Sequence, residues 1–135
     1  MTPTNNEIYM AAITLLNNAA LGYPVSYPGY NFTPPDDGAW LKVDFFPNTG
    51  LDNGLAYSDT VIPRGILQIE CVARPNAGLE NLQPVANQVR SVFAKGTAIA
   101  GQVRVTRQPY DMNLPPNEQY QPDRMKVVVS IEYSG

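Results

Sequence analysis

The run from Arg124 to Tyr133 alternates strictly between two classes of side chain, and this pattern constrains the fold more than any other feature of the sequence. Since successive residues of a strand face opposite sides, the run predicts a β-strand that is buried on one side only. A chain that contains it must supply a second layer to cover the apolar side. The apolar class comprises Met125, Val127, Val129, Ile131 and Tyr133, and the mixed class comprises Lys126, Val128, Ser130 and Glu132.

Four other runs predict further strands of the same sheet. Trp40–Phe46 and Arg64–Ala73 alternate in the same way, and Gln102–Gln108 predicts a shorter strand. Val25–Tyr27 is expected as a short edge strand, because the prolines around it are confined to sheet edges.

Two helices are expected to form the second layer. The first runs from Asn5 to Leu21, and Thr4 and Glu7 have the spacing of a capping box at its start. The second runs from Leu79 to Lys95 and carries one apolar stripe at helical spacing. Because each helix is apolar on one face only, each is expected to lie against the sheet.

These elements predict one α+β domain over residues 1–135, with two layers. We expect a mostly antiparallel or mixed sheet of four to five strands with both helices packed on one face. Residues 47–63 and 109–123 are expected as long loops, and such length is typical of binding segments. Ile66, Val72 and Val128 fall on the face away from the helices. They either fill strands well as β-branched residues or are covered by a neighbouring subunit.

Composition excludes many functions. The net charge of −3 argues against a general nucleic-acid binder, and the lack of histidine removes the usual general base and His-ligated zinc. Cys71, the single cysteine, is expected to be a buried core residue. No run reaches the roughly 18 apolar residues that a membrane span needs. We therefore expect a soluble protein assembled in a cytoplasm, with no cofactor, no metal, no catalytic residue and no membrane partner.

Charge is uneven along the chain. Residues 1–89 carry three positive and eight negative side chains, a net charge of −5, and residues 90–135 carry six positive and four negative, a net charge of +2. Either this is chance on a solvated surface, or an acidic patch meets a basic patch on the next copy in a head-to-tail contact. The basic candidates are Arg104, Arg107, Arg124 and Lys126, which could form a strip on neighbouring strands, as sheet-surface charges or as contacts to an acidic protein or to nucleic acid.

The acidic residues suit turns better than chemistry. Asp36, Asp37 and Asp52 lie among Gly, Pro and Asn, where an Asp side chain bonds its own backbone. A small-molecule enzyme or binding module would need a deep pocket lined by Asp36, Asp37, Tyr30 or Arg64.

The chain resembles the tail terminator proteins of long-tailed bacteriophages, in the group that includes the lambda tail terminator. The resemblance covers nearly the whole chain and depends on element order, length and local phrasing. It is carried by the capped first helix, the proline-rich run after it, the strand Trp40–Pro47, the run Arg64–Ile69, the helix from Asn81 to Gly96 and the long final strand.

The resemblance implies a structural subunit of the virion that caps the neck end of the tail tube as a six-membered ring. Such a ring would stop tube polymerisation and form the surface that joins the head connector. The implied partners are copies of the chain itself, the major tail tube protein and the head-tail connector protein, with DNA only as passing cargo. A second reading is another neck or head-completion protein, a connector or a stopper. Interface candidates in loops and at a sheet edge are Asp52, Tyr57, Arg104, Arg107, Asp111, Met112, Leu114, Tyr120, Arg124 and Lys126.

Overall fold

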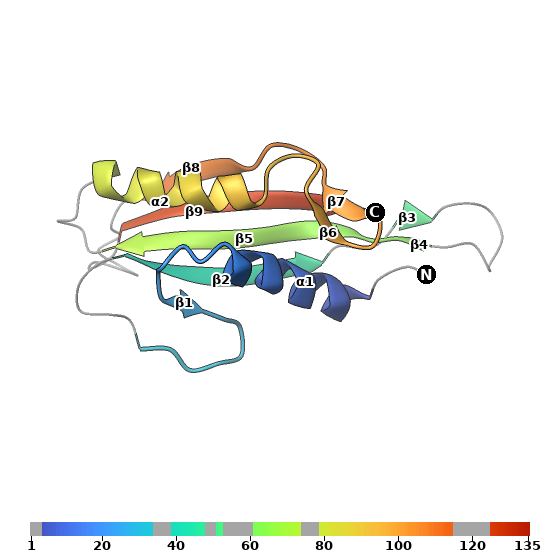
Figure 1. The fold of residues 1–135 in the computed structure, drawn as a ribbon, viewed down its shortest axis with the longest axis horizontal. Helices are drawn as coiled ribbons and strands as arrows, with labels where there is room; N and C mark the ends of the chain where they lie inside the picture. The colour runs from blue at the N-terminus through green and yellow to red at the C-terminus, as the bar shows by residue number, and fades with distance from the viewer. Residues whose placement is uncertain (1–3, 34–38, 48–50, 53–60, 74–78, 115–124) are drawn as a thin grey trace.

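The structure is a computed structural model, and it describes residues 4–33, 39–47, 51–52, 61–73, 79–114 and 125–135. It is an α+β fold with two helices and one large curled sheet (Figure 1). The expected fold class is therefore confirmed, while the number of strands is larger than expected. The predicted sites Asp36, Asp37, Tyr57, Tyr120 and Arg124 lie outside the described residues.

The central sheet has seven strands, and all but one of its pairs are antiparallel. The exception is the short edge strand β1, which runs parallel to β2. In spatial order the strands are β1 (Val25–Ser26), β2 (Trp40–Pro47), β5 (Arg64–Ala73), β9 (Met125–Ser134), β7 (Val103–Val105) and β6 (Ala98–Ala100), with β8 (Tyr110–Leu114) also paired to β9.

The expectation of four to five strands was wrong because two short strands depend on tertiary pairing. β6 forms only through its pairing with β7, and β8 forms within the run 109–123 that was expected to be a loop. The run 47–63 likewise contains a separate two-stranded sheet of β3 (Leu51–Asp52) and β4 (Val61–Ile62). The strand expected over Gln102–Gln108 is shorter, because β7 ends at Val105.

Helix α1 (Asn5–Asn18) begins with the predicted capping box. The Thr4 hydroxyl accepts from the Glu7 backbone amide at 3.2 Å, and the Glu7 carboxylate accepts from the Thr4 amide at 3.4 Å. The helix ends three residues before the expected Leu21, because Ala20 already adopts a left-handed φ of 50°.

Helix α2 (Leu79–Val92) ends before the expected Lys95. Gly96, four residues beyond the end of the helix, has a left-handed φ of 87°, and its amide donates to the Val105 carbonyl at 2.8 Å. The chain beyond Val92 therefore leaves the helix axis to join the sheet.

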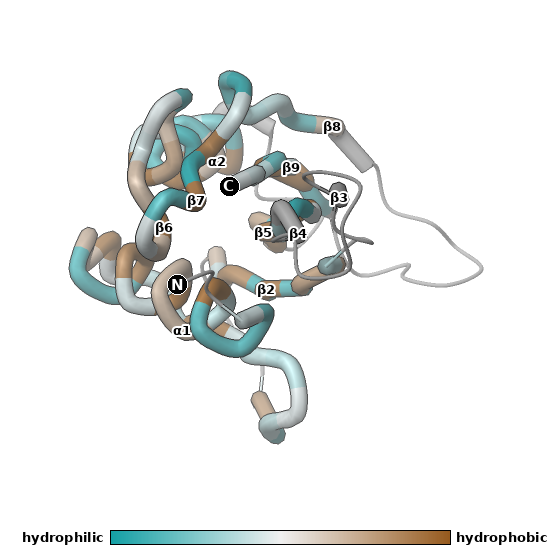
Figure 2. Tube along the Cα trace, turned by 90° about the vertical axis from the view of Figure 1, so that its right-hand side faces the viewer, coloured by the Kyte–Doolittle hydropathy of each residue, from teal (hydrophilic) through white to brown (hydrophobic). Residues whose placement is uncertain are grey.

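Both helices lie on the same side of the sheet (Figure 1). Seen from the end of the molecule, the strands curl from β2 through β5 and β9 to β7 and β6, so that β6 contacts α1 (Figure 2). One core cluster joins the two helices to the strand residues that face them. Its members include Ala12 and Leu16 from α1, Val85, Ala86 and Val89 from α2, and Leu41, Ile69, Cys71, Val127, Val129 and Ile131 from the sheet.

The register defines the two faces. Cys71 pairs with Leu41 on β2 and with Val127 on β9, and all three face the helices; this side is called the inner face. Glu70 pairs with Lys42 and with Val128, so these three lie on the opposite side, called the outer face.

Two of the three branched residues predicted on the outer face are already covered within the subunit. Val72 is 1% exposed and Val128 is 7% exposed, whereas Ile66 is half-buried. Trp40 pairs with Val72 across β2 and β5 and packs on Phe32, with ring centroids 5.0 Å apart. A neighbouring subunit is therefore not needed to bury Val72 or Val128.

Candidate functional site

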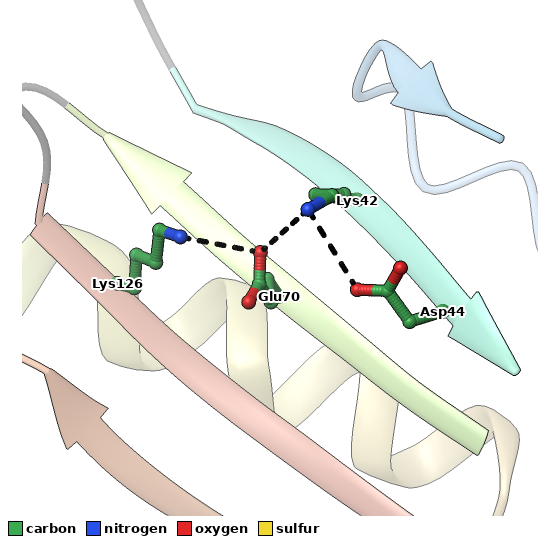
Figure 3. Close-up of polar contacts among 4 residues, drawn as sticks. All are labelled: Lys42, Asp44, Glu70 and Lys126. Atoms are coloured by element: carbon green, nitrogen blue, oxygen red, sulfur yellow. Dashed lines mark hydrogen bonds and ion pairs between the residues drawn. The ribbon is translucent and has the colours of Figure 1, made fainter. Parts of the chain in front are cut away.

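The outer face carries a ladder of charges across its three central strands (Figure 3). The Glu70 carboxylate lies between two lysines, with Oε2 at 3.4 Å from Lys126 Nζ and at 3.9 Å from Lys42 Nζ. Lys42 Nζ also lies 3.9 Å from the Asp44 carboxylate. The side chains of Glu70 and Lys126 are only 15% and 14% exposed. Solvent and salt therefore screen their contact less than the contact between Lys42 and Asp44.

Large apolar side chains are exposed at the two margins of this face. Phe46 on β2 is 52% exposed, and Tyr110 and Met112 on β8 are 43% and 59% exposed. The register places Tyr110 opposite Ser130 and Met112 opposite Val128, so both point to the outer face with Phe46. Exposed aromatic and Met side chains are typical of protein interfaces.

The predicted basic strip is not continuous. Arg104 pairs with Ser134 at one end of β9, while Lys126 lies near the other end, roughly 26 Å away at the usual rise of a strand. Lys126 is held by Glu70, as described above. Among the members of the strip that the structure describes, only Arg104 and Arg107 remain as neighbours, on and just after β7.

These two arginines are exposed but have contacts within the subunit. Arg107 Nη1 lies 3.2 Å from Glu132 Oε2, and its guanidinium lies 5.4 Å from the centre of the Tyr110 ring. Arg104 Nη1 donates to the Gly96 carbonyl at 3.3 Å. The cationic corner beside β8 is therefore made by Arg107 with Tyr110.

Of the other predicted contact residues, Met112 is exposed and Asp111 faces the helices. The Asp111 carboxylate lies 3.7 Å from Arg90 Nη1 of α2, so it anchors β8 to that helix. Leu114 ends β8 and Asp52 lies in β3, and for both the structure describes the backbone alone.

A hollow of about 280 Å³ runs along the edge of β2. Its walls are Tyr9 of α1, Pro28, and Asp44, Phe45 and Phe46 of β2. Residues of both faces of β2 line it, so it opens at the strand edge and not on either face. Burial, then the nearby Tyr27, Tyr30 and Asp44, raise the pKa of the Tyr9 phenol above its ordinary value.

A second hollow of about 170 Å³ lies where α1 ends. Neither hollow has Tyr30 or Arg64 in its lining, although the small-molecule hypothesis places them there. Tyr30 is 79% exposed.

Metal-ligating groups do not cluster in the described part of the chain. No set of three or more Cys, Asp or Glu side chains there has the geometry to hold a metal ion. Cys71 is fully buried, as predicted, and burial, with a smaller effect of Asp111, raises the pKa of its thiol to about 12. The thiolate that a nucleophile needs is therefore not formed near neutral pH.

Sequence reasoning missed Phe46 and Tyr110 as contact candidates. The alternation of Tyr110, Met112 and Leu114 is a strand signal, but flanking prolines led to a loop assignment. Phe46 was assigned to a strand correctly; that this strand lies near the sheet edge depends on topology alone.

Nine chains of known structure match this chain. One of them, whose name states no function, superposes with a TM-score of 0.75 at 22% identity, and the match covers 97% of this chain and 94% of the other. The fold is thus a recurrent one, a small α+β domain built on a curled sheet. No curated protein matches the sequence significantly.

Family comparison is more specific. The sequence matches the phage tail terminator protein family over residues 7–133, and the chain belongs to this family. It is therefore a structural protein of the bacteriophage tail, which favours a non-enzymatic role in the virion. Neither helix in the described residues is long and apolar enough to cross a membrane.

Proposed function

We propose that the protein caps the neck end of the tail tube as a ring, stops the addition of tube subunits, and offers its other side to the head connector. Membership of the tail terminator family over residues 7–133 carries this proposal. The proposed partners are further copies of the chain in a six-membered ring, the major tail tube protein and the head-tail connector protein.

The physical task explains why such a subunit needs surfaces and not catalytic groups. The end of a growing tube exposes a surface that accepts the next subunit, and a cap must fit that surface without presenting a copy of it. Exposed Phe46, Tyr110 and Met112 on one face support a role based on contacts.

Charge is compatible with DNA as passing cargo. A chain of net charge −3 is not expected to bind the DNA phosphates through counterion release. DNA could therefore pass through a ring of such subunits without binding to it. The described cationic side chains Lys42, Arg107 and Lys126 already lie beside carboxylates.

Tail length is the readout that tests the proposal. Phage tails assembled without this protein are expected to be over-long or to fail to join heads, as measured by electron microscopy of particles. Adding the purified protein back should restore the length distribution and head joining. Tails of normal length that join heads in its absence would contradict the role.

Position in the particle separates this function from its rival. Labelled protein is expected at the junction of tube and connector, in contact with the last tube ring. A label found only within the head connector would instead favour a connector or stopper protein.

A further inference from the structure

We propose that neighbouring copies join by pairing the edge of β8 in one copy with the open edge of β2 in the next, so that Tyr110 and Met112 pack against Phe46. This inference rests on the proposed ring and names the two surfaces that would build it. It concerns a contact between copies of this chain, not a contact with the tube or the connector.

The first surface is the part of β2 beyond Lys42. β1 pairs with β2 only at Leu41 and Lys42, and the Leu41 amide donates toward this side, to the Pro24 carbonyl at 2.9 Å. Because alternate residues of a strand point the same way, Val43 and Phe45 direct their N–H and C=O groups to the same edge. Within the described residues, no strand takes up these groups.

The second surface is β8. It pairs with β9 along all five of its residues, and in the described part of the chain no strand pairs with its other side. β8 and β2 lie on opposite sides of the β5–β9 pair, so one subunit offers two different strand edges facing away from each other (Figure 2). Open edges of this kind accept a further strand by main-chain hydrogen bonding.

The exposed side chains beside the two edges lie on the same face of the sheet and are all large and mainly apolar. Phe46 on β2 and Tyr110 and Met112 on β8 all point to the outer face and are all about half exposed. Strand pairing between copies would bring these three together and remove them from water. The apolar contact and the backbone pairing therefore require the same arrangement.

The hollow beside β2 agrees with this occupant. The hollow of about 280 Å³ at the edge of β2 leaves room for side chains of an incoming strand. The charged side chains near the two edges already have partners within the subunit: Asp44 lies 3.9 Å from Lys42 Nζ, and Arg107 lies 3.2 Å from Glu132 Oε2. The contact would therefore be made by the strand edges and the apolar side chains beside them.

Strand direction is compatible with a closed ring. Three successive antiparallel pairs separate β2 from β8, so the two strands run in opposite directions in one subunit. Copies related by rotation about an axis roughly along the strands would then pair β8 with β2 in the antiparallel sense. Such a contact uses two different surfaces, and it closes into a ring when the rotation per subunit permits.

Charged substitutions at the two edges test the inference. Phe46→Lys and Met112→Lys are each expected to abolish the ring, giving the mass of a monomer in light scattering. Met10→Lys is the matched control, because Met10 is also 52% exposed but belongs to α1 and to neither strand edge, and it should keep the wild-type mass. Circular dichroism of each variant establishes that the fold is retained. A ring of wild-type mass in both edge variants would overturn the inference.

Disulfide trapping tests the contact directly, without depending on loss of assembly. A chain with Phe46→Cys and Met112→Cys is expected to form a ladder of cross-linked copies on oxidation, while Met10→Cys with Met112→Cys should not. The native Cys71 thiol is fully buried and should stay unreactive.

The outcomes separate the two proposals. If the 46–112 pair fails to cross-link both in solution and in purified tails, the inference is overturned, and tail capping is still decided by tail length. If the ladder forms but tails assembled without the protein are normal, the surfaces are correct and the capping function is wrong.

Discussion

The two faces of the central sheet differ in almost every respect although they belong to the same strands. On the inner face Ile69, Cys71 and Val129 are fully buried beneath the helices. On the outer face the same strands carry Glu70 and Lys126 in the centre, with exposed Phe46 and Met112 at the margins. The difference indicates that the inner face stabilises the subunit, while the outer face and its edges are available for contacts with other subunits.

The largest expected loss of stability comes from shortening a buried side chain on the inner face. Ile69→Ala should lower the free energy of unfolding by about 2–5 kcal/mol, because it removes buried methyl groups and leaves a cavity between sheet and helices. Gln68→Ala, one position earlier and on the outer face, should change it by about 0.5 kcal/mol or less. Urea unfolding of both variants measures the contrast, and equal losses would show that the faces do not differ in this way.

A backbone contact at the start of β5 is expected to give the next largest effect on stability. A Cβ at Gly65 would lie 2.5 Å from Tyr133 Oη and 2.7 Å from the Phe46 carbonyl oxygen. Gly65→Ala should therefore cost about 1–3 kcal/mol of stability through overpacking. Adding Tyr133→Phe should recover part of the loss in thermal unfolding; no recovery would place the strain on the Phe46 backbone instead.

The charge ladder should contribute less than the inner core. Glu70→Ala leaves the mostly buried Lys126 ammonium without its carboxylate and should cost about 1–2 kcal/mol. Asp44→Ala removes a more exposed contact to Lys42 and should cost about 0.5 kcal/mol or less. Denaturant midpoints in low and high salt check both values, since only the exposed pair should be strongly screened.

The smallest effect at neutral pH is expected for Tyr133→Phe. The buried Tyr133 hydroxyl has no hydrogen-bond partner in the described structure, so its removal should change stability by about 0.5 kcal/mol or less, in either direction. At high pH the same residue becomes informative. Burial raises the Tyr133 pKa from 10.0 to about 12, and it raises the Cys71 pKa from 9.0 to about 12.

The sign of the pH effect follows from these directions. The folded state keeps both groups protonated more strongly than the unfolded state, so their stabilising contribution is complete below pH 9 and is lost as pH rises toward 12. Wild-type stability should therefore fall between pH 9 and 12, and Tyr133→Phe should make the fall shallower. Urea titrations across this range measure it, and identical slopes would mean that Tyr133 titrates normally.

Local sequence patterns predicted the elements whose structure depends on their own residues. The Thr4–Glu7 capping box and the final strand needed no information from the rest of the chain, and both are confirmed, the strand from Met125 onward. β8 was missed because it depends on β9, and prolines flank it on both sides. A strand that needs a distant partner leaves only a weak trace in its own residues.

Only some residues of the candidate site were predicted, because the site also depends on pairing between distant strands. Met112 and Arg107 were chosen as contact residues, and the structure places them beside the same edge. Lys126 was expected to extend a basic strip, yet it contacts Glu70, 56 positions earlier in the chain, because of the β5–β9 register. Register between distant strands is a property of the whole fold, so sequence patterns could not supply this contact.

The position of β9 has a consequence for the timing of folding. This strand follows all the others in the chain, yet it lies in the middle of the sheet, between β5 on one side and β7 and β8 on the other. A nascent polypeptide emerging from the ribosome therefore has no complete sheet until β9 has been synthesised. Non-local pairing of this kind also slows folding. Unfinished chains would accordingly not display β8, the edge proposed to join copies, in its final place.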